Sequence, residues 1–143
     1  MLIALIPIVY LVYNVFYAFF SIPAGRLSDK IGRKKVLVFG LMLFALTALG
    51  FAFFADTATI WALFALYGLF MAVTDGVSRA YVSDLTITNK RGTALGAYHT
   101  IVGITVLPAN LIGGLLWQKV SVQAAFVYAA ALSLISAILL IIL

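Results

Sequence analysis

The chain has 143 residues, of which 66% are hydrophobic and 9% are charged, and its formal net charge is +5. A soluble domain is about half apolar and about a quarter charged, so these counts exclude a soluble enzyme, a disordered tail and a secreted disulfide scaffold. The sequence has no cysteine and a single histidine. Disulfides, thiolate metal sites and multi-histidine metal sites are therefore excluded as well.

Five apolar stretches are long enough to cross the membrane as helices. A bilayer core of about 30 Å takes about 20 helical residues, and the stretches run over about residues 1–24, 36–55, 59–83, 93–117 and 122–143. They lack the alternation of outer-membrane barrel strands, and a helix satisfies its own backbone in lipid. The sequence predicts an all-α membrane protein with one transmembrane domain, residues 1–143, surrounded by the lipid bilayer.

The positive charges alternate between the connections. The 25–35 and 84–92 connections hold most of them, namely Arg26, Lys30, Arg33, Lys34, Lys35, Lys90 and Arg91. Basic loops stay in the cytoplasm, so we expect these two connections inside the cell, the N-terminus outside and the C-terminus inside. Membrane topology thus explains the net charge, and we expect no nucleic-acid partner. Because the span count is odd and no basic anchor precedes the first span, we expect a missing segment upstream.

Residues 25–35, GRLSDKIGRKK, resemble the loop signature G-x-L-[SA]-D-[RK]-x-G-R-[RK] of the major facilitator superfamily of secondary transporters. A basic turn that only sets topology is the alternative, but it needs neither glycines nor an aspartate. Gly25 and Gly32 permit a tight turn. The resemblance implies that Asp29, Arg33 and Lys34 form a conformational switch, which latches the two halves of a transporter together on the cytoplasmic side in one state.

Further similarity to the family lies along residues 13–25, 67–84 and 91–117. It implies helices eight to twelve of a twelve-helix bundle, an incomplete C-terminal half, although the same signature also occurs in the first half. The implied function is movement of a small solute by alternating access in the cell (inner) membrane, driven by a gradient, with the missing N-terminal half as partner. Two alternatives stay open: a non-transporting interaction subunit or truncated product of this fold, and an unrelated five-helix protein. Residues 22–25 and 107–110 also match as parts of an internal repeat.

Charged side chains inside a span indicate a functional or structural role, since inserting each one near mid-bilayer costs about 2.5–3.5 kcal/mol. Asp75 and Arg79 share a helix face, and His99 lies at a similar depth on the next span. These three and Asn14 are candidates for a substrate or proton pathway. The alternative is an Asp75–Arg79 pair that neutralises itself, and Asn14 equally suits a bond between helices.

Small residues in the fourth span indicate helix packing. Gly92 and Gly96 form G-x-x-x-G, Gly103 follows on about the same face, and Pro108 predicts a kink. The sequence holds no phosphate-binding G-x-x-x-x-G-K-[ST] loop, nucleophile–base pair or metal cluster. We therefore expect no catalytic residues, no metal and no cofactor.

Overall fold

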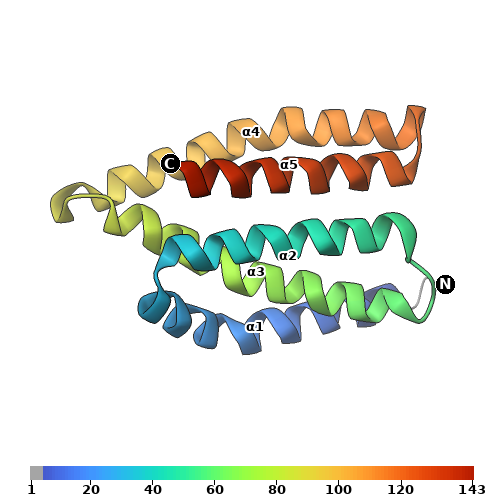
Figure 1. Ribbon diagram of the computed structural model, residues 1–143, viewed down its shortest axis with the longest axis horizontal. Helices are drawn as coiled ribbons and strands as arrows, with labels where there is room; N and C mark the ends of the chain where they lie inside the picture. Colours follow the sequence, from blue (N-terminus) through green and yellow to red (C-terminus); the bar gives the residue numbers. More distant parts are fainter. Residues whose placement is uncertain (1–4) are drawn as a thin grey trace.

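The computed structural model describes residues 5–143, and five long helices account for most of them (Figure 1). These are α1 (Ile6–Ile31), α2 (Arg33–Phe53), α3 (Thr59–Asp84), α4 (Arg91–Lys119) and α5 (Val122–Ile142), with a short 3-10 helix, η2 (Thr88–Lys90), before α4. All five are long and apolar enough to span a membrane. The prediction of an all-α membrane protein with five spans is confirmed; residues 1–4 of the first predicted span lie outside the described range.

The helices run roughly parallel to one another along the long axis of the molecule (Figure 1). The α1–α2 junction, the α3–α4 connection and the C-terminus lie at one end, which we call the basic end because it carries Arg26–Lys35 and Lys90–Arg91. The α2–α3 and α4–α5 connections lie at the opposite end. The two basic connections therefore share one end of the bundle, as the alternation of charge predicts.

The signature segment is almost entirely helical, and the predicted loop over 25–35 is wrong. α1 continues past residue 24 to Ile31, α2 begins at Arg33, and Gly32 alone separates them. The Gly32 amide still donates to the Ser28 carbonyl at 3.1 Å. Gly32 then takes φ 97°, a backbone conformation that residues with a side chain rarely adopt. One glycine makes the turn, because the polar residues before it continue the helix into the aqueous interface.

The other helix ends agree with the predicted spans to within a few residues. α3 begins at Thr59, where the Asp56 carboxylate accepts hydrogen bonds from the amides of Ala58 and Thr59, both at 2.8 Å. These amides stabilise the charged form and lower the pKa of Asp56. Ser121 caps α5 in the same way, accepting from the Ala124 amide at 3.0 Å. Side-chain caps thus fix both helix starts at the opposite end of the bundle.

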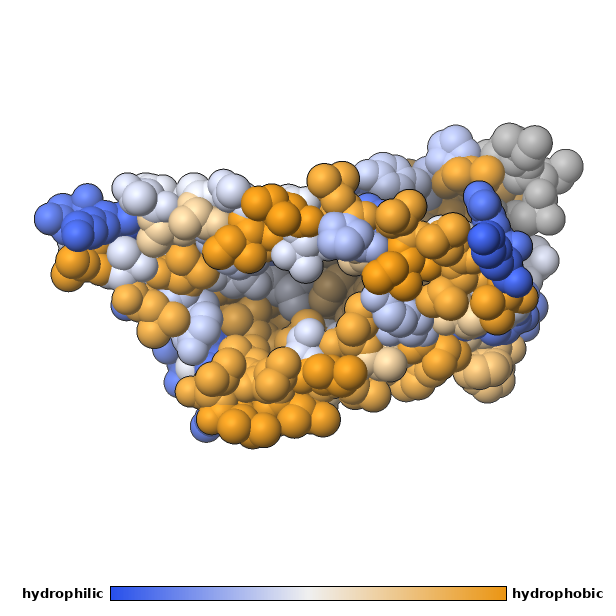
Figure 2. Space-filling model, turned by 90° about the horizontal axis from the view of Figure 1, so that it is seen from above, coloured by the Kyte–Doolittle hydropathy of each residue, from blue (hydrophilic) through white to orange (hydrophobic). Residues whose placement is uncertain are grey.

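Small side chains form the buried core. One cluster joins α1, α2 and α3 and consists of Ala24, Val36, Leu37, Val73 and Val77. A second cluster of alanines joins α2 to α5, next to which the Ser133 hydroxyl donates to the Leu41 carbonyl at 2.7 Å. α4 contains no buried residue. Large apolar side chains cover much of the outer surface, with polar groups gathered toward its ends (Figure 2), as suits helices in lipid.

Candidate functional site

The α1–α2 junction is organised around Arg33. Its guanidinium lies 3.1 Å from the Asp29 carboxylate, one helical turn earlier on the other side of Gly32. The same guanidinium pairs with Asp84, the last residue of α3, and lies within hydrogen-bond distance of the Ser28 hydroxyl. Asp84 is a partner that sequence reasoning missed, because it lies far from Arg33 along the chain. Two of the three predicted switch side chains thus meet, and they are joined to a third helix.

Lys34 reaches a different helix. Its ammonium donates to the Ile141 carbonyl at 3.3 Å, in the last turn of α5, where carbonyl groups carry the negative end of the helix dipole. Asp29 keeps 62% of its side chain exposed and Arg33 keeps 23%. Exposed pairs of this kind contribute about 0.2–1 kcal/mol each. The junction therefore holds the basic ends of α1, α2, α3 and α5 together through contacts weak enough to exchange.

A second charged cluster lies inside the membrane span. Asp75 on α3 pairs with Arg79 one turn further along the same helix. The Tyr17 hydroxyl of α1 donates to the same carboxylate oxygen at 2.7 Å. The structure thus contains the internal pair that the spacing predicts, and it adds an interhelical hydrogen bond. Sequence reasoning missed the role of Tyr17 because nothing in the sequence aligns α1 with α3.

His99 and Asn14 do not join this cluster. His99 is exposed and packs edge-on against its neighbour Tyr98, with ring centroids 5.2 Å apart. The Asn14 amide donates to the carbonyl of Tyr10 in its own helix, at 2.8 Å. His99 therefore does not meet Asp75 and Arg79 in this structure, because α4 packs only loosely on α3.

Both charged clusters face one cavity of about 360 Å³ between α1 and α3. Its lining includes the four charged side chains Asp29, Arg33, Asp75 and Arg79, together with Tyr17. The junction and the membrane cluster therefore border the same cavity.

The glycines that pack closely differ from those predicted. A Cβ added to Gly92, Gly96 or Gly103 meets no atom of the described chain within 4 Å. Within residues 5–143 the predicted packing role of these glycines is thus not found, and Pro108 lies inside an unbroken α4. The close approaches are at Gly40 against Thr74 and Val73, Gly50 against Leu63, and Gly68 against the Tyr13 carbonyl. They fall where α2 and α1 cross α3, which the sequence alone does not reveal.

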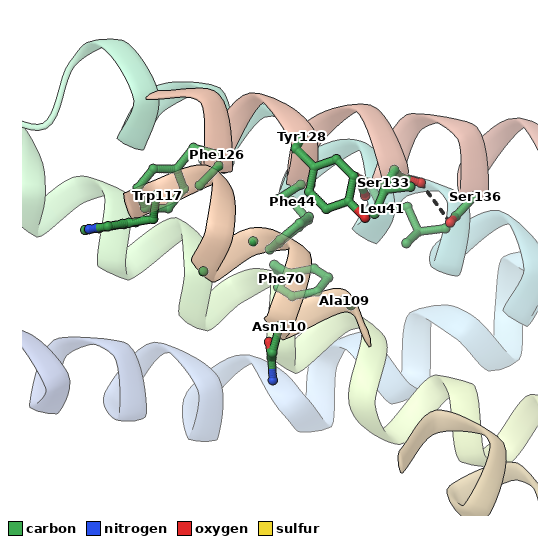
Figure 3. Close-up of a pocket in the computed structure, with 15 residues that line it drawn as sticks. Leu41, Phe44, Phe70, Ala109, Asn110, Trp117, Phe126, Tyr128, Ser133 and Ser136 are labelled. Atoms are coloured by element: carbon green, nitrogen blue, oxygen red, sulfur yellow. Dashed lines mark hydrogen bonds between the residues drawn. The ribbon is translucent and has the colours of Figure 1, made fainter. Parts of the chain in front are cut away.

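A larger cavity of about 560 Å³ opens between α4 and α5 and reaches α2 and α3 (Figure 3). The rings of Phe44, Phe70 and Tyr128 gather in its middle, and Trp117 and Phe126 lie together toward the α4–α5 connection. Small residues form much of the remaining wall, namely Ala109, Gly113, Gly114, Ala125, Ala129, Ser133 and Ser136. Asn110 also lies on this wall.

A bundle of long apolar helices with its charges at the helix ends and a paired charge inside the span is typical of a polytopic membrane transport protein. The sequence model of the Major Facilitator Superfamily matches residues 3–143. The chain belongs to this superfamily of membrane transporters.

Several curated relatives are named as transporters. An uncharacterized MFS-type transporter of Methanocaldococcus jannaschii is 51% identical over 95% of this chain and 34% of its own length. The inner membrane transport protein YajR of Escherichia coli is 35% identical over 86% of this chain and 27% of its own. The class H tetracycline resistance protein of Pasteurella multocida is 32% identical over 82% of this chain and 29% of its own length. The chain thus spans about a third of the length of these relatives.

Proposed function

We propose that the chain is part of a secondary carrier, from its eighth helix to its twelfth, that moves a small amphiphilic solute by alternating access. The family match over residues 3–143 supports the carrier, and the matched share of about a third of each relative supports a part of one. The part acts together with the missing N-terminal half. In this proposal it lies in the cell membrane with the basic end in the cytoplasm.

The observation that carries the mechanism is the position of Asp29 beside Arg33. Asp84 and Ser28 hold Arg33 on the α3 side, while the Asp29 carboxylate stays 62% exposed. One face of that carboxylate is therefore open to a donor from the opposite half. We infer that this contact latches the cytoplasmic side in one state and breaks in the other, at a cost that weak surface pairs permit.

The solute class is inferred from the membrane charges and from two relatives. Asp75 and Arg79 neutralise each other, so the span offers no unpaired charge of one sign for a multiply charged solute. The Pasteurella multocida relative is a tetracycline resistance protein, and a Bacillus subtilis relative, 29% identical, is named multidrug resistance protein 2. In this proposal Asp75, Arg79 and Asn14 line the pathway, and His99 reaches it only if α4 rotates in another state.

The test uses a complete carrier, made by replacing the matched region of the M. jannaschii relative with this chain. Asp29→Asn removes the latch charge and keeps the size of the side chain. We expect it to reduce gradient-driven movement of a fluorescent amphiphilic dye into proteoliposomes by at least fivefold, and to raise labelling of an engineered cysteine in the central pathway from the cytoplasmic side.

Asp56→Asn, at the opposite end of the bundle, is the matched control, because asparagine still accepts the two capping hydrogen bonds. It should transport and label like the unmodified chimera. Equal behaviour of the two variants would overturn the latch. Absence of dye movement in a folded chimera, with the labelling change intact, would leave the latch standing and contradict the proposed solute class.

A further inference from the structure

Asp75 borders a second cavity besides the one that it shares with the junction. This second cavity has a volume of about 590 Å³ and is lined by residues of α2, α3, α4 and α5. Arg79 lines the 360 Å³ cavity between α1 and α3 and does not line this one. Of the two partners in the membrane ion pair, only the aspartate therefore borders the second cavity.

The second cavity is apolar apart from Asp75 and a few hydroxyl groups. Phe70 and Tyr98 bring aromatic rings to its wall. Phe70 and Leu41 also line the 560 Å³ cavity, so the two spaces adjoin. Among residues 5–143, Asp75 is the one charged side chain that lines either of them, and both have the volume of a small-molecule site, about 300–1,000 Å³. A solute in this space would therefore meet one negative charge and no positive charge of the described chain.

The Asp75 carboxylate has capacity for a further positive partner. The Tyr17 hydroxyl and the Arg79 guanidinium both donate to its Oδ2 atom, and neither of them donates to Oδ1. A carboxylate accepts through both of its oxygens. The Asp75 side chain also keeps 33% of its surface exposed, so a cation can approach it without displacing the Tyr17 hydroxyl.

Aromatic rings lead along α1 to this carboxylate. Tyr10, Tyr13 and Tyr17 stack in series, with ring centroids 5.3 and 6.2 Å apart, and Tyr67 of α3 stacks on Tyr13 at 5.3 Å. Tyr17, the last ring of the series, is the one that binds Asp75. Ring faces attract cations, most strongly where water is excluded. Several ring faces next to a single carboxylate are chemistry that recognises an organic cation.

We infer that the solute is an amphiphilic organic monocation, whose charged group binds Asp75 and whose apolar body lies against Phe70 and Tyr98. The inference rests on the proposed function and names the charge of its solute. Arg79 then acts as a tethered competitor, which occupies the carboxylate when no solute is bound. Its side chain is 48% exposed, so it can leave Asp75 without becoming a buried, unpaired charge.

The test measures binding rather than transport. The chimera with the M. jannaschii relative is purified in mild detergent, and the probe is radiolabelled methyltriphenylphosphonium, a monocation. Triphenylphosphine oxide, which is uncharged and of nearly the same shape, is the competitor. In the unmodified chimera we expect it to compete at least tenfold more weakly than the unlabelled cation. Asp75→Asn, which removes the negative charge and keeps the size of the side chain, should weaken binding of the cation at least tenfold.

Arg79→Gln distinguishes a cation site from a structural ion pair. Removing the tethered competitor should strengthen binding of the cation about threefold, whereas a pair that only stabilises α3 would make Asp75→Asn and Arg79→Gln fail alike. Asp56→Asn is the matched control, because it removes one carboxylate charge at the opposite end of the bundle and should bind like the unmodified chimera. Size-exclusion chromatography verifies that each variant is folded.

Three results would overturn the inference: equal binding by Asp75→Asn and Asp56→Asn, loss of binding in a folded Arg79→Gln variant, and equal competition by the uncharged compound. The last needs no variant, so it decides even if Asp75→Asn misfolds. Because the assay involves no gradient, binding that depends on Asp75 without any dye movement would keep the cation site and contradict the carrier. Gradient-driven movement of an anionic dye that Asp75→Asn leaves unchanged would keep the carrier and overturn the cation.

Discussion

The carboxylates at the two ends of the bundle have different structural roles, helix capping at one end and ion pairing at the other. Asp56 caps α3 at the opposite end through two backbone amides, whereas Asp29 and Asp84 share one guanidinium at the basic end. The cap joins residues that are close in sequence, so a sequence pattern can indicate it. The sharing of the Arg33 guanidinium cannot be predicted in this way, because Asp84 becomes a neighbour of Arg33 only when α3 packs on α1.

The Asp56 cap makes the start of α3 sensitive to acid. Its hydrogen bonds from backbone amides lower the pKa of Asp56 below its ordinary value of 3.8. Its contribution to stability is therefore fully present above pH 3.8 and is lost as the pH falls through the lowered pKa. The protection of the Ala58 and Thr59 amides against hydrogen exchange, measured relative to an unstructured chain at the same pH, should fall over that range. Asp56→Ala should show low protection at every pH, and protection that does not change with pH in the unmodified chain would contradict the cap.

Removing the Arg33 guanidinium breaks both ion pairs at once. Because the three side chains are partly to largely exposed, we expect Arg33→Gln to lower the free energy of unfolding in mixed micelles by only about 1 kcal/mol. Arg26→Gln, which removes the same charge from an exposed residue with no ion pair among residues 5–143, should change it by less than about 0.5 kcal/mol. Equal changes in the two variants would show that the free energy of unfolding depends on net charge and not on the ion pairs of Arg33.

At the scale of the helices, the turn between α1 and α2 depends on one residue. Gly32 at φ 97° resists any side chain, so Gly32→Ala should lower the free energy of unfolding by about 1–3 kcal/mol. Gly25 lies inside α1, and an added Cβ meets nothing within 4 Å. Gly25→Ala should therefore raise stability by up to about 1 kcal/mol. We therefore expect the two alanine substitutions to change the free energy of unfolding in opposite directions when both are measured by the same unfolding titration.

The crossing of α1 over α3 depends on Gly68. An added Cβ there meets the Tyr13 carbonyl and lies 3.0 Å from Cβ of Phe16, which forces the helices apart. We expect Gly68→Ala to cost about 1–3 kcal/mol and to weaken the Tyr17–Asp75 hydrogen bond, seen as a change in the tyrosine resonance Raman spectrum. Gly76→Ala on the same helix, where nothing lies within 4 Å, should leave that spectrum unchanged.

At the scale of the whole molecule, composition and charge alternation suffice to predict the five spans and to predict that the basic connections lie at one end of the bundle. The signature is recognisable from its letters, but its helical form is not, because Gly32 alone breaks the backbone. The partners Asp84, Ile141 and Tyr17 depend on which helices are neighbours. The same holds for the packing glycines. The G-x-x-x-G motif on α4 is the clearer sequence signal for helix packing, yet among these glycines only Gly40 and Gly68 lie against another helix of the described chain.

Sidedness is the last property that the whole molecule must satisfy, and the absence of native cysteine makes it directly measurable. Ile31→Cys and Ile87→Cys report on the basic end, Thr57→Cys and Val120→Cys on the opposite end, and all four keep every charge. Because basic loops stay in the cytoplasm, an impermeant maleimide added to intact cells should label only residues 57 and 120. Labelling of residues 31 and 87 from outside would place the Asp29 latch on the wrong side of the membrane. Disagreement within either pair would contradict the shared end itself, since the α1–α2 junction and the α3–α4 connection lie at the same end of the bundle (Figure 1).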